Sequence, residues 1–238
     1  MDKIEDFLTA RQPTAVRPLL GLTVLLIEDS RFASEAVRLL CVRSGARIRR
    51  ADSLENARKH LAVYRPSVVI VDAGLPDGSG LPLIEQLVLG SPRIDVVLGT
   101  SGDPGMEEAV LAMGADGFLP KPMENLAAFQ AAILKHLPAD QQPPGPRLIN
   151  DENVAPDIIA YHDDLSHVAE VLGSDDAGEA VDYVTQFLGG VATSAADTDI
   201  HRAVEQLKAL RERGAPLDGA IATLSGLVQD RLATRGPI

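Results

Sequence analysis

The chain has 238 residues, of which 45% are hydrophobic and only 3% aromatic, so one or two domains with aliphatic cores are expected. A single cysteine, Cys41, excludes an internal disulfide and a cysteine-based zinc site. The net charge of −12 is concentrated in residues 151–238, which hold 16 acidic and 6 basic residues, and so acidic a segment argues against a nucleic-acid reader. With no signal-peptide core and no apolar run of roughly 20 residues, the chain is expected to be cytoplasmic.

Residues 1–20 are predicted to form an N-terminal extension. It contains one apolar patch, made of Ile4, Phe7 and Leu8. The patch is compatible either with a small helix packed on the body or with a disordered segment.

Residues 21–137 alternate short apolar runs with amphipathic ones. The expected strands are 23–27, 46–50, 68–71, 96–98 and 117–119, and the expected helices are 32–43, 53–63, 81–89, 107–113 and 124–136. Continuously apolar runs in the middle strands are typical of buried parallel strands. The alternation predicts an α/β domain with a doubly wound, five-stranded parallel sheet.

Residues 138–150 are predicted to be a linker, because 138–147 contain four prolines. Residues 151–238 contain no strand-like run. Four amphipathic helices are expected there, at about 156–172 with Pro156 in the first turn, 176–194, 199–213 and 217–233. They should form a small all-α bundle, with apolar positions left for a partner or a second copy.

Polar side chains follow four of the predicted strands. Glu28 and Asp29 follow the first strand, Asp72 the third, Thr100 the fourth and Lys121 the fifth. Because ligands bind outside the carboxyl ends of parallel strands, these groups should converge on one spot. Three carboxylates, a hydroxyl and an ammonium would form a hard-cation site beside a phosphate-sized space. The alternative is that they are only strand-end polar residues that cap helices.

This pattern resembles the receiver domain of two-component response regulators over roughly residues 21–138. The matching residues occur in the family's order, each at a strand end: Glu28, Asp29, Asp72, Leu75, Pro76, Gly78, Thr100, Phe118, Lys121 and Pro122. The resemblance implies a flavodoxin-like sheet with strand order 2-1-3-4-5.

The resemblance also implies that Asp72 accepts a phosphoryl group from a sensor histidine kinase or a phosphotransfer protein. Its carboxylate would be the nucleophile that forms an acyl phosphate. Mg²⁺ would be held by Glu28, Asp29, Asp72 and the backbone carbonyl of Gly74, and would offset the negative charge. Apart from gaining and losing this phosphoryl group, the chain is not expected to be an enzyme.

Three further residues have roles implied by the family. Lys121 would act as a point cation on the phosphoryl oxygens, and Thr100 would donate its hydroxyl to one of them. The ring of Phe118 would then move into the space that Thr100 leaves, and the readout surface would be residues 105–136. Phe118 replaces a tyrosine often found there, and Ser101 stands where alanine is usual. Neither departure removes a required group.

Three hypotheses describe the output of residues 151–238. The first is protein–protein interaction or self-association, which fits the acidic charge and the linker. The second is an enzymatic or phosphotransfer module that uses His162 or His167, although the lysine-glycine pattern typical after such a histidine is missing. The third is a transcription factor, which needs a basic recognition helix that six scattered basic residues do not provide.

Other charged and aromatic residues are expected to have simpler roles. Most histidines should be solvated or packed helix residues, and the acids around Asp163 and Asp164 a solvated helix face. Phe32 lies on the helix where the family usually meets its histidine kinase. Five arginines are expected either to form a solvated rim or to contact an acidic partner such as the chain's own C-terminal segment: Arg38, Arg43, Arg47, Arg49 and Arg50.

Overall fold

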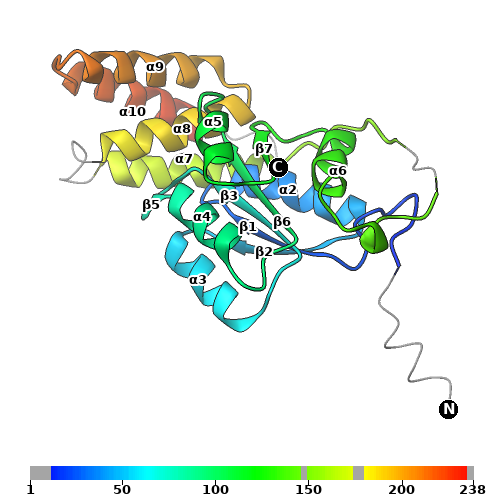
Figure 1. Cartoon of the computed structure of the whole chain (residues 1–238). Helices are drawn as coiled ribbons and strands as arrows, with labels where there is room; N and C mark the ends of the chain where they lie inside the picture. The colour runs from blue at the N-terminus through cyan, green and yellow to red at the C-terminus, as the bar shows by residue number, and fades with distance from the viewer. Residues whose placement is uncertain (1–11, 146–148, 174–179, 235–238) are drawn as a thin grey trace.

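The computed structural model describes residues 12–145, 149–173 and 180–234 (Figure 1). Its main sheet has five parallel strands in the order β2-β1-β3-β6-β7, which confirms the predicted doubly wound topology. The strands are β1 (Thr23–Ile27), β2 (Arg47–Ala51), β3 (Val68–Asp72), β6 (Val96–Ser101) and β7 (Gly117–Pro120). The helices between and after them are α2 (Arg31–Ser44), α3 (Leu54–Val63), α4 (Leu81–Leu89), α5 (Met106–Ala112) and α6 (Leu126–Leu134).

Two aliphatic layers cover the sheet, because successive strand residues point to opposite faces. In β1, Val24 and Leu26 pack with α2 and α6, whereas Leu25 and Ile27 pack with α3, α4 and α5. Every residue of β3 is buried, as expected for the central strand of a parallel sheet. The carboxyl end of this strand, where Asp72 lies, is therefore fixed from both sides.

Segments outside the predicted sheet and helices also pack on this domain. Leu19 and Val154 are buried in the layer beside α2 and α6. Val154 lies in a stretch that runs antiparallel to the start of α6 through a bridge between Asn125 and Asn153. A short hairpin, β4 (Gly74–Leu75) with β5 (Gly78–Ser79), was not predicted, and neither was the 3₁₀ turn η1 (Ala139–Gln141). The patch at Ile4, Phe7 and Leu8 lies outside the described residues.

The C-terminal part forms the predicted helical bundle. Its helices are α7 (Ile158–Leu172), α8 (Val181–Ser194), α9 (Thr198–Glu212) and α10 (Asp218–Ala233). The prediction that Pro156 lies in the first turn of this bundle's first helix is wrong. Asp157 caps α7 by accepting the backbone N–H of Ile159, so Pro156 precedes the helix. The core is mostly aliphatic and includes Leu165, Val168, Leu188, Val204 and Leu224, all fully buried.

The bundle lies across the carboxyl end of the sheet (Figure 1). Helices α7 and α8 contact α2, and α8 also contacts β4, while α9 and α10 form the side away from the sheet. None of the described helices combines the length and the hydropathy that crossing a membrane requires.

Candidate functional site

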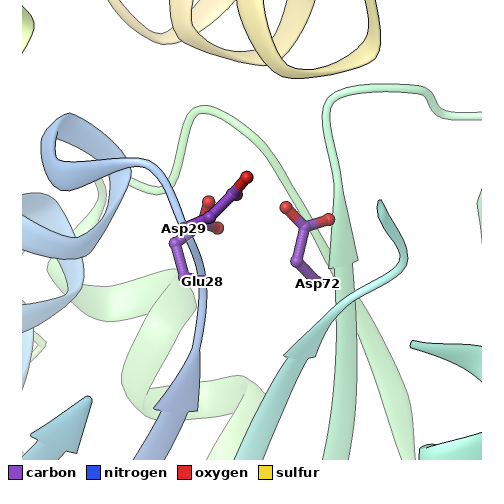
Figure 2. Close-up of side chains that lie close together, drawn as sticks. All are labelled: Glu28, Asp29 and Asp72. Atoms are coloured by element: carbon purple, nitrogen blue, oxygen red, sulfur yellow. The ribbon is translucent and has the colours of Figure 1, made fainter. Parts of the chain in front are cut away.

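The ends of β1 and β3 bring three carboxylates together. One oxygen each from Glu28, Asp29 and Asp72 lies within 4.8 Å of the other two (Figure 2). Glu28 is completely buried and Asp72 is 6% exposed. Arg50, from the end of β2, donates to the backbone carbonyls of Glu28 and Asp29, which fixes the loop that carries both acids.

Lys121 provides the positive charge of this cluster, as the sequence predicts. Its Nζ lies 2.6 Å from Asp72 Oδ2 and 2.6 Å from Glu28 Oε2, and its side chain is only 6% exposed. Burial disfavours the ammonium, but the charges of Asp72 and Glu28 outweigh this effect and raise the pKa of Lys121. The amine therefore stays protonated between the two acids.

Burial also raises the pKa of two of the acids. Burial is the largest cause for Glu28, whose pKa lies well above its usual range, and Asp72 and Asp29 add repulsion while Lys121 opposes it. For Asp29, burial and the charge of Asp72 raise the pKa to about 6 against the opposing effect of Lys121. A further positive charge at this spot would lower both values.

A divalent cation fits this group of oxygens. Three carboxylates are grouped within 4.8 Å, two of them are buried, and the one ammonium paired with them among the described residues is that of Lys121. Oxygen-rich, acidic surroundings are those that Mg²⁺ binds in proteins. Gly74, whose carbonyl the sequence analysis adds to the ligand set, donates its N–H to Asp72 Oδ1 at 3.2 Å, so the two residues are adjacent.

Thr100 pairs with Asp72 across the register of β3 and β6. Its hydroxyl is buried and donates to the carbonyl of Leu119 at 2.7 Å, which directs the proton toward β7. Phe118 is half-buried and packs on the layer that includes α5. Ser101 is buried, and its Oγ accepts the N–H of Asp103 at 3.1 Å.

Helix α8 supplies a residue that the sequence analysis missed. The hydroxyl of Tyr183 donates to Asp29 Oδ2 at 3.1 Å, and His167 Nε2 lies 3.1 Å from the same hydroxyl. The pale yellow ribbon above the carboxylates in Figure 2 is α8. No local pattern pairs positions 29 and 183, because the contact exists only once the bundle packs on the sheet.

Asp164 is also placed differently from the sequence expectation. It was expected on a solvated face, but it is only 2% exposed and caps α2 from outside the domain. Its Oδ2 accepts from Ser30 Oγ at 2.7 Å and from the N–H of Phe32 at 3.0 Å, and its Oδ1 accepts from the N–H of Arg31 at 2.8 Å. Three donors at a helix N-terminus therefore hold one carboxylate.

Phe32 is buried in the core of the bundle instead of lying open on α2. Its ring packs edge-on against Tyr161, with centroids 5.8 Å apart. The face of α2 around this ring is therefore covered by α7 and α8. Of the five arginines, Arg43 pairs with Glu152 of the acidic C-terminal segment and Arg38 with Glu35.

A cavity of about 690 Å³ lies between the carboxylates and the bundle. The sheet side contributes the three acids, Lys121, Ser101 and Gly102, and the bundle side contributes Gln186, Thr193, His201 and Lys208. The cavity is thus lined by polar and charged groups from both parts of the chain.

Comparison with known proteins identifies the first part of the chain. The family model "Response regulator receiver domain" matches residues 24–133. The KDP operon transcriptional regulatory protein KdpE of Escherichia coli (strain K12) is 29% identical over 140 residues, which cover 58% of this chain and 61% of that protein. Response regulator MprA of Mycobacterium sp. (strain KMS) is 30% identical over 128 residues, which cover 52% of this chain and 56% of that protein.

Among solved structures, the chain is similar to a response regulator protein from Burkholderia pseudomallei with a phosphorylated aspartic acid, calcium ion and citrate. The identity is 29%, the TM-score is 0.41, and the match covers 47% of this chain and 66% of that one. The match to each curated relative spans less than two thirds of that relative's length. Helices α7 to α10 lie outside the segment that the family model matches. Residues 24–133 of this chain are therefore a response regulator receiver domain.

Proposed function

We propose that the chain is a cytoplasmic two-component response regulator that is phosphorylated on Asp72 by a histidine kinase or a phosphotransfer protein. The observation that carries this proposal is the grouping of Asp72 with Glu28, Asp29 and Lys121 at the carboxyl end of the sheet. An oxygen of Asp72 would attack the phosphorus, and the bond between phosphorus and the donor atom would break. The donor leaves with that electron pair, and Asp72 becomes an acyl phosphate.

Glu28, Asp29, Asp72 and the carbonyl of Gly74 would hold Mg²⁺ at this site. When bound, Mg²⁺ offsets the charge of the carboxylates and of the phosphoryl oxygens. Lys121 would form an ion pair with the phosphoryl oxygens from the position that it now occupies beside Asp72.

Thr100 and Phe118 would form the switch. To donate to a phosphoryl oxygen, the hydroxyl of Thr100 has to leave the carbonyl of Leu119. The ring of Phe118, which is only half-buried, can move into the space that is vacated. Phosphorylation would thus alter the surface formed by α5, β7 and α6.

We further propose that the output is a protein contact or self-association and not DNA binding. KdpE is a transcriptional regulatory protein by name, but the family match to this chain ends at residue 133. Residues 151–238 hold 16 acidic and 6 basic residues, and an excess of negative charge repels a phosphate backbone. A mobility-shift assay with generic DNA at low salt should therefore show no retarded band.

The test of the main proposal is phosphorylation by acetyl phosphate, followed by intact-protein mass spectrometry. The native chain should gain the mass of one phosphoryl group with Mg²⁺ and none with EDTA. Asp72→Asn should gain none under either condition, because an amide is not a nucleophile for this reaction. Asp77→Asn changes an exposed acid in the turn between β4 and β5; it is the matched control and should be labelled like the native chain. Equal labelling of Asp72→Asn and the native chain would rule out Asp72 as the acceptor.

A further inference from the structure

Helix α8 covers the carboxylate site closely. Tyr183 bonds Asp29, and Gln186, one turn further along the same helix, lies against Gly74. Both residues face the part of the receiver domain that is proposed to hold the cation. The side chains that cover the site thus contact two of its four proposed ligands.

The shapes of the two surfaces match at two glycines of the receiver domain. A Cβ atom at Gly74 would lie 1.5 Å from Gln186 Nε2, and a Cβ atom at Gly102 would lie 3.0 Å from the Cα atom of Gly190. A side chain at position 74 would displace the end of the Gln186 side chain, whereas one at position 102 would meet the backbone of α8 and require the helix to move. The close approach therefore depends on residues of both parts of the chain.

Helix α7 also attaches the bundle to the receiver domain, next to the contacts made by α8. Asp164 accepts three hydrogen bonds from residues 30–32, which directly follow the acids Glu28 and Asp29. Phe32, in the first turn of α2, is buried among apolar residues of α7 and α8. Polar and apolar contacts together attach the bundle to the loop that carries two of the carboxylates.

We propose that α8 is an intramolecular cover of the carboxylate site, which competes with the cation and with the phosphoryl group on Asp72. This inference rests on the proposed function, because the site must bind both ligands. Tyr183 is the positioning residue of the cover, since its hydroxyl donates to Oδ2 of Asp29, one of the three grouped carboxylates. A protein that presents a phosphorylated side chain has to approach through the space that α8 fills, whereas the cavity of about 690 Å³ admits small molecules.

Competition at one carboxylate has a reciprocal consequence. If the docked bundle weakens cation binding by some factor, the cation weakens docking by the same factor. Weakening the cover by mutation should therefore strengthen Mg²⁺ binding. A purely structural role of Tyr183 would leave Mg²⁺ binding unchanged or reduce it.

The test is Mg²⁺ binding to the full chain, measured by isothermal titration calorimetry. Tyr183→Phe removes one hydrogen bond to a carboxylate and should tighten Mg²⁺ binding by about tenfold. Tyr161→Phe is the matched control, because Tyr161 also donates to an aspartate, Asp197, but does so inside the bundle. Its Mg²⁺ affinity should equal that of the native chain. Unchanged or weaker affinity in Tyr183→Phe would overturn the proposal.

A second variant keeps the test decisive if Tyr183→Phe fails to fold. Gly102→Leu leaves Tyr183 itself unchanged but places a side chain against the backbone of α8 at Gly190. The helix and the hydroxyl of Tyr183 should move away from Asp29, so Mg²⁺ binding should again tighten about tenfold. Failure to do so while the protein unfolds cooperatively would contradict the cover. The acetyl phosphate test on Asp72 distinguishes the failure of the two proposals. If the variants bind Mg²⁺ more tightly but the native chain is not phosphorylated, the proposed phosphorylation is rejected and the cover is kept. If the native chain is phosphorylated but the variants bind Mg²⁺ with native affinity, the cover is rejected and the phosphorylation is kept.

Discussion

Replacing Lys121 by methionine is expected to lower the free energy of unfolding by about 3–5 kcal/mol in the absence of divalent cations. The ammonium lies 2.6 Å from both Asp72 and Glu28, and removing it leaves two buried carboxylates without a positive partner. Part of the loss should return when Mg²⁺ is added, because the cation replaces the missing charge. Urea denaturation with EDTA and with Mg²⁺ measures both effects.

The control for this variant is Lys135→Met, which removes the same charge from an exposed position at the end of α6. Its stability should change by less than about 0.5 kcal/mol, as is usual for surface substitutions. Equal stabilities of the two variants in EDTA, or a Lys121→Met protein that Mg²⁺ stabilises no more than the native chain, would contradict the electrostatic account of the site.

Asp164→Asn should lower the free energy of unfolding by about 2–3 kcal/mol and weaken the attachment of the bundle. The amide oxygen, in the place of Oδ2, can still accept from Ser30 Oγ and from the N–H of Phe32, but the amide nitrogen cannot accept from the N–H of Arg31. One backbone donor would then lose its partner, and the negative charge at the N-terminus of α2 would be lost as well. Urea denaturation gives the loss of stability, and small-angle X-ray scattering gives the expected increase in radius of gyration.

Asp163→Asn is the matched control for this second prediction. Asp163 is the preceding residue of α7 and pairs with Arg31, but both side chains are well exposed. Such surface pairs contribute about 0–1 kcal/mol, so its stability and radius of gyration should stay close to native. Equal stabilities and equal radii of gyration of the two variants would show that Asp164 does not attach the bundle to the receiver domain.

The fold of the receiver domain was predictable from the sequence because its signals are local. Apolar runs such as 68–71 mark buried strands, and Ser53 and Asn125 cap α3 and α6 through their own side chains. The hairpin of β4 and β5 was missed, since each of its strands has only two residues and no period can be read from them. The start of α7 was misplaced because Pro156 fits a first turn, but Asp157 is the better cap.

Local signals also predict which receiver residues form the site, but not which residues of the bundle lie against it. Glu28, Asp29, Asp72 and Lys121 each follow a strand, and parallel strands end at one edge of a sheet. Tyr183 and Asp164 reach this edge from helices more than 130 residues away along the chain. The sequence shows that a helix is amphipathic, but it does not show which domain each face of the helix contacts. An acid on a polar helix face, such as Asp164, is therefore expected to be solvated until the packing of the two domains is known.

Hydrogen exchange at the N-terminus of α2 tests most directly whether the C-terminal helices cover the Asp72 site and leave it when the site is occupied. The backbone amides of Arg31 and Phe32 donate to Asp164 of α7, so their exchange reports attachment of the bundle. With Mg²⁺ and beryllofluoride as a phosphoryl mimic, exchange at these amides should accelerate in the native chain but not in Asp72→Asn. Amides of α3, which lies outside the proposed readout surface, should exchange alike in both. Equal protection of Arg31 and Phe32 with and without the mimic would contradict the account.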